Sequence, residues 1–180
     1  SKLPQIEDNG GRYRESNIEK DALKIFSNHG ANLIRLRLWH STSDNYVNLN
    51  KTQILAKRAD SLGMKFLLDF HYSDTWADPS HQTKPTAWNS LGFEELKDSV
   101  YQYSYNVLSA LKKQNTIPTI IQIGNEINCG MLWGDGNVCG SRNTDAQWYK
   151  LSALLNSGIN GVKDALDTKD SSKIMIHYSE

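Results

Sequence analysis

Ionisable and amide side chains recur where four apolar runs of the sequence end. They are Arg35 and Arg37, then Asp69 and His71, then Asn125 and Glu126, and finally His177. Each has an ordinary explanation by itself, because an arginine can pair with a nearby carboxylate and a lone histidine is more often a hydrogen-bonding partner than a catalyst. Burying so many ionisable groups together is costly without mutual pairing or a ligand. Their recurrence at successive run ends therefore indicates one functional site.

Glu126 is the strongest catalytic candidate. It follows the apolar run from Thr119 to Ile123 and then Gly124, so its carboxyl would emerge at the end of a strand with Asn125 beside it. A carboxyl among apolar walls keeps its proton more readily, as a general acid at a glycosidic oxygen requires. Asn125 could donate a hydrogen bond to a sugar hydroxyl. The alternative is an Asn-Glu pair that only caps a loop.

Aromatic side chains follow the same run ends, where their ring faces could stack on the C–H surfaces of sugars. They are Trp39, Tyr72, Trp76, Trp88 and Trp133. Polar residues that could read hydroxyl groups share one loop with some of them, namely Asp74, Asp78, His81 and Gln82. A single loop tryptophan more often anchors its loop by packing. Trp148 lies on an apolar helical face instead, and we expect it in the core.

Several other kinds of site are not indicated. His71 and His177 have no metal-ligand spacing around them, and two cysteines do not make a zinc site. No Gly-rich phosphate loop and no G-x-S-x-G turn is present. Twenty basic and twenty acidic residues cancel without long blocks of one sign, so the sequence predicts neither a nucleic-acid nor a membrane partner. We expect a neutral partner, no cofactor and no metal.

Cys129 and Cys139 enclose a short segment that holds three glycines and could bend to bring the thiols together. A disulfide and two free thiols both remain open from this spacing. No apolar run approaches the roughly 20 residues of a membrane span, and the first residues lack a signal-peptide layout. We expect a soluble chain whose export signal has been removed or was not included.

Apolar spacing and caps predict helices that alternate with short strands. The expected helices run from Ser16 to about Gly30, Lys51 to Leu62, Phe93 to Lys113 and Asp145 to Leu166, and the expected strands are Ala31 to Trp39, Lys65 to Phe70, Thr119 to Ile123 and Lys173 to His177. Ser16 and Glu19 form a capping-box pattern, which would turn Ile18 and Phe26 inward. Such alternation predicts βαβ units and a parallel sheet.

The loops that leave the expected strands are the long ones, notably His71 to Gly92 and Ile127 to Thr144. Loops longer than about 12–15 residues in a compact domain are usually functional. In a (β/α)8 barrel the loops at the carboxyl ends of the strands build the active site. An open doubly wound sheet would place its site at the same end, so the loops do not separate the two folds.

Three runs of the sequence resemble glycoside hydrolase family 53. They are IRLRLW from Ile34 to Trp39, LLDFHYSDTWADP from Leu67 to Pro79, and IIQIGNE from Ile120 to Glu126. Further matches are Trp88 after Lys-Pro-Thr-Ala, the stretch from Gly130 to Trp133, and the stretch from Ile174 to His177. The resemblance covers essentially the whole chain.

The resemblance implies an α/β fold, the (β/α)8 barrel, of which this chain carries roughly the first half, strands two to five with their helices. Residues 1–180 would form one partial catalytic barrel that lacks the first strand and strands six to eight. The implied activity is that of a retaining endo-β-1,4-galactanase on the (arabino)galactan side chains of pectin. Such an enzyme would be a secreted, extracellular monomer, periplasmic or at the cell surface in a bacterium.

The resemblance also implies roles for particular residues. Glu126 would be the general acid/base and Asn125 its sugar-reading neighbour, while Arg35, or alternatively Arg37, would hold the carboxylate of the nucleophile. The other cleft residues would be Asp69, His71, Trp76, Asp78, Trp88 and His177. The nucleophile itself would lie on strand seven, which has no counterpart here, and Glu180 does not match it. We therefore expect the 180 residues alone to be inactive.

Two other functions remain open. One is a related barrel glycosidase that acts on another β-linked hexose polymer, such as mannan or glucan. The other is a non-catalytic carbohydrate-binding protein, which would fit a missing nucleophile beside retained aromatic residues.

Overall fold

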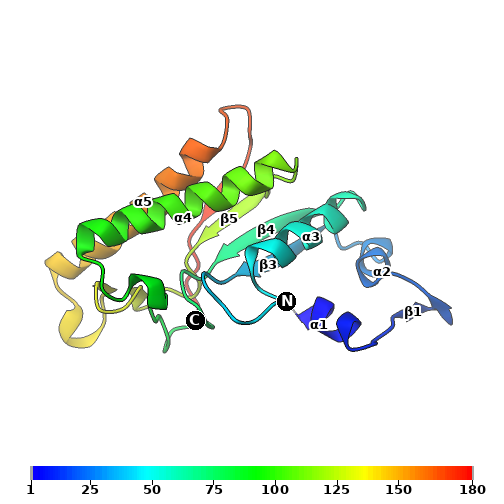
Figure 1. The fold of residues 1–180 in the computed structure, drawn as a ribbon, viewed down its shortest axis with the longest axis horizontal. Coiled ribbons are helices and arrows are strands. Elements are labelled where there is room, and N and C mark those ends of the chain that lie inside the picture. Colours follow the sequence, from blue (N-terminus) through cyan, green and yellow to red (C-terminus); the bar gives the residue numbers. More distant parts are fainter. Residues whose placement is uncertain (1, 180) are drawn as a thin grey trace.

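The computed structural model describes residues 2–179, so Glu180 lies outside the described residues. Its centre is a four-stranded parallel sheet in the order β3-β4-β5-β8 (Figure 1). The strands are β3 (Leu33–Leu38), β4 (Lys65–Phe70), β5 (Ile120–Ile123) and β8 (Lys173–Met175). The expected alternation of helices with parallel strands is confirmed, and the bounds of β4 agree with those expected from the sequence.

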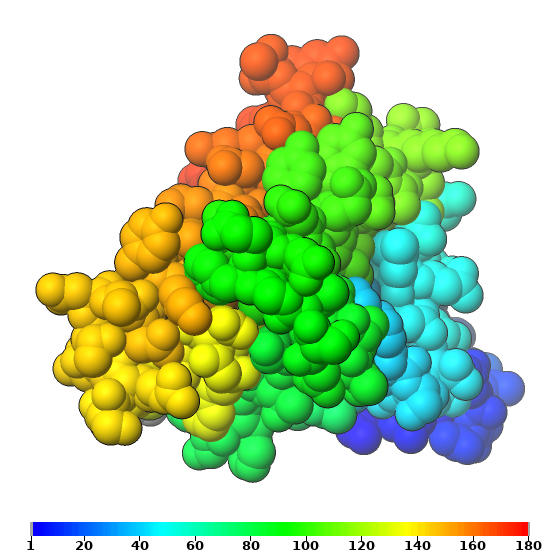
Figure 2. Space-filling model, turned by 60° about the vertical axis from the view of Figure 1, so that its left-hand side comes forward, coloured from blue at the N-terminus to red at the C-terminus, as the bar shows by residue number. Residues whose placement is uncertain are grey.

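Three helices cover one face of this sheet. They are α3 (Leu49–Asp60), α4 (Phe93–Lys113) and α5 (Asp145–Ala165). The main core cluster lies between them and the sheet, and it contains Leu38, Leu68 and Ile121 from the strands. Figure 2 shows this helical layer as a continuous surface, with α5 in orange, α4 in green and α3 in cyan. The layer leaves the other face of the sheet to polar side chains.

Alternation along each strand sorts the side chains between the two faces. In β3, Leu36 and Leu38 are buried in the core, while Arg35 and Arg37 point the other way. The parallel register then places Arg37 opposite Asp69 of β4, and Asp69 opposite Gln122 of β5. The sheet thus builds a row of polar side chains on the face away from the helices.

The expected helix from Ser16 is wrong. Strands β1 (Arg14–Glu15) and β2 (Ile18–Glu19) pair as a hairpin, whose two turn residues, Ser16 and Asn17, have φ of 50° and 65°. Positive φ at both central residues is typical of a two-residue hairpin loop. Helix α2 (Ala22–Asn28) begins only after Asp21, whose Oδ1 accepts a hydrogen bond from the Lys24 backbone N–H at 2.9 Å.

Three side chains expected to point inward are exposed. The hairpin leaves Ile18 62% exposed, and the shorter α2 leaves Phe26 52% exposed. The expectation for Trp148 is also wrong, because its side chain is 51% exposed and its Nε1 donates to Asn143 Oδ1 at 2.8 Å. Helix α5 instead buries the face that carries Leu151, Leu154 and Val162.

The remaining elements lie at the edges of the sheet. Helix α1 (Lys2–Asp8) precedes the hairpin, and the loop after β4 contains the 3₁₀ turn η1 (Thr86–Trp88). The loop after β5 contains a small hairpin of β6 (Gly130–Met131) and β7 (Gly136–Asn137), the 3₁₀ turn η2 (Gly140–Arg142), and a disulfide between Cys129 and Cys139. Among the helices of residues 2–179, none combines the length and apolar character of a membrane span.

Candidate active site

Six of the ten candidate residues line one hollow of about 200 Å³ at the carboxyl end of the sheet. They are Arg35, Arg37, Asp69, Trp76, Asn125 and Glu126. Strands β3 and β4 supply the arginines and Asp69, the loop after β4 supplies Trp76, and the turn after β5 supplies the Asn-Glu pair. The parallel register explains the convergence, because the carboxyl ends of neighbouring strands meet at one edge.

Asp69 is the buried centre of a hydrogen-bond network behind this hollow. Its side chain has no exposed surface, and its Oδ2 lies 3.0 Å from Arg35 Nη2 and 3.2 Å from His71 Nε2. Its Oδ1 accepts a hydrogen bond from Gln122 Nε2 at 2.6 Å. A fully buried carboxylate requires this kind of compensation. Asp69 therefore fixes the positions of Arg35, His71 and Gln122.

His71 supports Asp69 and does not line the hollow. Its Nδ1 accepts a hydrogen bond from the Ala77 backbone N–H at 3.0 Å, so the ring proton must sit on Nε2, which donates to Asp69. The His71 side chain has no exposed surface. This geometry makes His71 a positioning residue rather than one that meets a ligand.

Asn125 is held on both sides of its amide. Its Oδ1 accepts a hydrogen bond from Arg35 Nη2 at 2.6 Å, and its Nδ2 donates to the Ala77 carbonyl at 2.8 Å. One amide hydrogen remains for the sugar contact expected from the sequence. His177 lies against the pair, with Nδ1 3.0 Å from Asn125 Oδ1 and 3.3 Å from the Glu126 backbone nitrogen.

Glu126 is half-buried in the hollow and has a φ of 49°. Within residues 2–179, no side chain or backbone group hydrogen-bonds its carboxylate, whereas its backbone N–H faces His177 and its carbonyl accepts a hydrogen bond from Gln82. The walls around it differ from the apolar ones expected, because Arg37, Asp69 and Trp76 line the same hollow. A carboxyl without a fixed partner, beside stacking and donor groups, is available for proton transfer to a ligand.

Arg37 and Trp76 form one wall of the hollow. The guanidinium carbon lies 4.3 Å from the centre of the indole ring, and Trp76 remains 44% exposed. Partial burial is the main cause that lowers the pKa of Arg37, with Asp69 opposing it. A second hollow of about 150 Å³ shares this wall, and Lys2, Gln5, Trp39, Asp44, Tyr46 and Val47 complete it.

Like His71 and His177, two further candidate residues lie outside the hollow. Trp88 is 5% exposed and packs its ring against His40, with ring centres 4.5 Å apart, so it anchors its loop. Asp78 forms a bridge with His81, and the Asp78 Oδ1 lies 2.9 Å from His81 Nδ1. The structure does not bring either side chain to Glu126.

Sequence reasoning missed the roles of two glutamines. Gln122 is fully buried and connects Asp69, Arg35 and Asn125. The sequence did contain one indication of this role, because Gln122 is a polar residue inside the otherwise apolar run of β5. Gln82, expected to read hydroxyl groups, is 2% exposed and donates instead to the carbonyls of Asn125 and Glu126.

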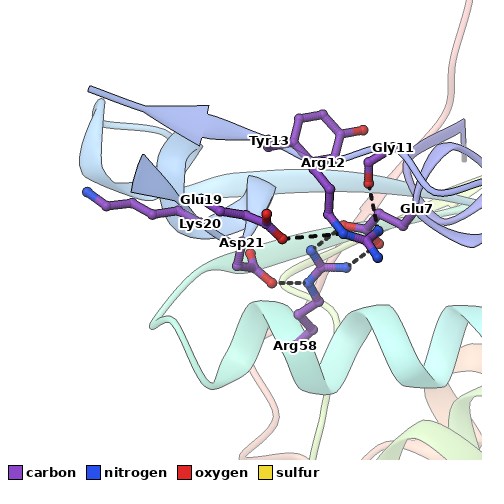
Figure 3. Close-up of a pocket in the computed structure, with 8 residues that line it drawn as sticks. All are labelled: Glu7, Gly11, Arg12, Tyr13, Glu19, Lys20, Asp21 and Arg58. Atoms are coloured by element: carbon purple, nitrogen blue, oxygen red, sulfur yellow. Dashed lines mark hydrogen bonds and ion pairs between the residues drawn. The ribbon is translucent and has the colours of Figure 1, made fainter. Parts of the chain in front are cut away.

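A hollow of about 340 Å³ elsewhere in the molecule contains none of these residues. Figure 3 shows that its charged side chains, except Lys20, pair with one another. Arg58 binds Glu7 through both terminal nitrogens, at 2.8 and 2.7 Å, and its Nε lies 2.6 Å from Asp21. The hydrogen bonds that Arg58 donates to Glu7 are the main cause that raises the pKa of Arg58. This network fastens α1 and the start of α2 to α3.

Comparison with known proteins matches the whole chain to one protein family. Residues 1–180 match the model of glycosyl hydrolase family 53. The chain is 45% identical over 177 residues to an uncharacterized protein of Niallia circulans, covering 97% of this chain and 48% of that protein. It is 37% identical over 184 residues to the arabinogalactan endo-beta-1,4-galactanase of Cellvibrio japonicus, covering 100% of this chain and 48% of that protein.

The structural comparison agrees. The solved Ignisphaera aggregans GH53 catalytic domain superposes with a TM-score of 0.88 at 40% identity, covering 99% of this chain and 49% of that domain. The expected fold class, an α/β partial barrel, is confirmed by this similarity. The chain spans about half the length of the curated relatives it matches.

Proposed function

The chain belongs to glycosyl hydrolase family 53, and on that premise we propose that the protein in which it functions hydrolyses β-1,4-galactosidic bonds within galactan chains. The substrate is the (arabino)galactan of pectin side chains, cut internally and with retention. A relative that is 37% identical carries the name arabinogalactan endo-beta-1,4-galactanase, and one that is 41% identical carries the name probable arabinogalactan endo-beta-1,4-galactanase A. Residues 1–180 form part of one catalytic barrel in this proposal.

The observation that carries the proposal is the Glu126 carboxyl, which points at no fixed partner within residues 2–179 and shares its hollow with Trp76 and Asn125. Glu126 donates its proton to the leaving oxygen and later takes a proton from water. Asn125 contacts the sugar, and Trp76 stacks on it. Asp69, His71 and His177 orient these groups, while Asp78 and Trp88 shape the loop that carries Trp76.

Retention requires a second carboxylate only about 5–5.5 Å from the first. Asp69 also lines the hollow, but it has no exposed surface and is bound by Arg35, His71 and Gln122. It cannot attack a sugar carbon from that position. As the resemblance to family 53 implies, we propose that the nucleophile is a carboxylate of strand seven, which has no counterpart in these 180 residues. Arg35, which is 41% exposed, holds that carboxylate with its remaining N–H groups, and Arg37 is the alternative.

The test is Glu126→Gln in the full-length protein. The amide keeps the shape of the carboxyl but cannot donate a proton, so turnover on galactan should fall by about 10²–10⁴-fold while KM changes little. The matched control is Glu94→Gln, because the Glu94 side chain is 79% exposed on helix α4. Unchanged turnover in Glu126→Gln would refute the assignment.

Product analysis decides the substrate. Pure galactan, mannan and β-glucan are incubated separately with the full-length protein, and galacto-oligosaccharides of several lengths should appear from galactan alone. Release from mannan or glucan would indicate a different barrel glycosidase. Binding of galacto-oligosaccharides in isothermal titration calorimetry without any product would indicate a carbohydrate-binding protein.

We also propose that the protein acts outside the cell as a monomer. The disulfide between Cys129 and Cys139 supports this location, because disulfides persist in oxidising compartments. Activity in the culture medium and the mass of the full-length protein in solution test the two statements.

A further inference from the structure

The geometry points to Gln82 as a positioning residue that sets the direction of the Glu126 carboxyl; this inference rests on the proposed function of Glu126. Gln82 lies in the loop after β4, far from Glu126 in sequence, and only 2% of its surface is exposed. Its side chain does not face the hollow that contains Glu126. Its contacts are with the backbone of the turn that carries the catalytic pair.

The Gln82 amide faces three carbonyl oxygens. Nε2 donates to the backbone carbonyl of Asn125 at 2.8 Å, to that of Glu126 at 3.2 Å and to that of Asp78 at 3.0 Å. Carbonyl oxygens can only accept, so the NH₂ end must point toward them. The Gln82 backbone carbonyl in turn accepts from the Trp133 N–H at 2.7 Å. Gln82 therefore joins both long loops to the catalytic turn.

This turn needs outside support because the sheet no longer provides it. The ladder between β5 and β8 ends at the pair Gln122 and Met175. Beyond it, Gln122 Nε2 donates to the Gly124 carbonyl at 2.8 Å, and Gln82 covers the next two carbonyls. The backbone N–H of Ile127 donates to the His177 carbonyl at 3.0 Å. Hydrogen bonds from side-chain amides thus take the place of the ladder hydrogen bonds along the turn.

The conformation of Glu126 depends on this support. Its φ of 49° lies in the left-handed region, which residues with side chains adopt only when the surroundings hold them there. Within the described part of the chain, no hydrogen-bond partner holds the carboxylate itself, so its direction depends strongly on the backbone conformation of Glu126. Loss of the Gln82 hydrogen bonds would let the peptide rotate and turn the carboxyl away from the glycosidic oxygen.

The experiment compares Gln82→Met and Gln82→Glu in the full-length protein. Methionine removes the donors, and glutamate keeps the shape but sets acceptor oxygens against the carbonyls. We expect kcat on galactan to fall by about 10²-fold, the loss that a displacement of a catalytic group by about 1 Å can cause, with little change in KM. The matched control is Gln114→Met, because Gln114 Nε2 also donates to a backbone carbonyl, that of Gln53 at 3.1 Å, at the end of α4.

A second readout separates positioning from stability. An aryl β-galacto-oligosaccharide with a good leaving group needs no proton from Glu126 in its first step. The pre-steady-state release of the aryl group should therefore be nearly unchanged in Gln82→Met, although galactan turnover falls. A purely structural defect would lower both rates together, and that result would overturn the proposal.

The remaining outcomes are also decisive. Galactan turnover equal to wild type in a folded Gln82→Met protein, with Glu126→Gln inactive, would overturn the role of Gln82 and leave the proposed function intact. Full activity of Glu126→Gln would remove the proposed function itself. Failure of both Gln82 variants to fold, with Gln114→Met folded, would assign Gln82 a structural role and overturn the proposal.

Discussion

At the residue scale, the side chains that could be found from sequence are those that stand out against an apolar background. Arg35, Asp69 and Glu126 each interrupt or follow an apolar strand, and the structure brings them to one hollow. Gln82 gave no such sign, because it lies in a polar loop and acts on the backbone of a distant turn. Contacts of that kind depend on tertiary structure and have no local pattern.

His40 gives a prediction about pH. Its ring packs against Trp88 and Tyr103, with ring centres 4.5 and 4.6 Å away. Burial is the main cause that lowers the pKa of His40 below 6.5, and Asp74 opposes the shift. The unfolded chain therefore binds the proton at this ring more tightly than the folded protein does. The stability from the neutral ring is complete above pH 6.5 and is lost as the pH falls toward the lowered pKa.

The measurement is the free energy of unfolding in urea between pH 7 and 5. We expect a decrease of up to about 1.4 kcal/mol per pH unit from this one group, and a shallower decrease in His40→Gln. His29→Gln is the control, because the His29 side chain is 71% exposed. Equal slopes for the wild type and His40→Gln would show that this ring does not contribute.

At the element scale, long amphipathic segments could be predicted and short ones could not. The bounds expected for α4 and β4 agree with the structure, because each has a clear period and a clear stop. The Ser16 to Glu19 pattern was misleading, since a serine and a glutamate three residues apart also fit a hairpin with a two-residue turn. The positive φ of Ser16 and Asn17 decides the matter.

The disulfide gives a prediction for the loop after β5. Cys129 and Cys139 are ten residues apart, so in the chain-entropy description their bond stabilises the fold by about 2–3 kcal/mol. The double variant Cys129→Ser, Cys139→Ser should lose that amount in urea unfolding. Turnover should change less, because the turn at Glu126 is held by Gln82 and His177.

Reductant provides the control for that experiment. It should lower the unfolding free energy of the wild-type protein and leave the double variant unchanged. If turnover fell in proportion to stability, the disulfide and not the glutamine would be what orients the catalytic turn.

At the scale of the whole molecule, sequence patterns predicted a parallel α/β sheet, and the comparison with solved structures confirmed a partial barrel. The surface was harder to predict. Trp148 lies on an apolar helical stripe, which normally indicates a core, yet its side chain is 51% exposed. Which apolar faces are covered depends on the neighbours of each element, and a sequence pattern does not contain them.

The exposed face around Trp148 carries several apolar side chains. Trp148, Leu155, Ile159 and Ile176 help to line a hollow of about 330 Å³ beside α5 and β8. Large apolar patches on soluble proteins usually mark a contact surface. If residues 1–180 are part of one barrel, as we propose, the rest of that barrel covers this face in the full-length protein.

Residues 1–180 produced alone should therefore bind an apolar dye, self-associate and show no galactanase activity, because they expose the patch and lack the nucleophile. The full-length protein should neither bind the dye nor self-associate. In that protein, acrylamide should quench the fluorescence of Trp148 only weakly, as judged by comparison with a Trp148→Phe variant. Replacing Ile176 with Ser should reduce self-association of the 180-residue chain and destabilise the full-length protein. Strong quenching of Trp148 in the full-length protein would contradict this, because it would mean that the face remains open to solvent.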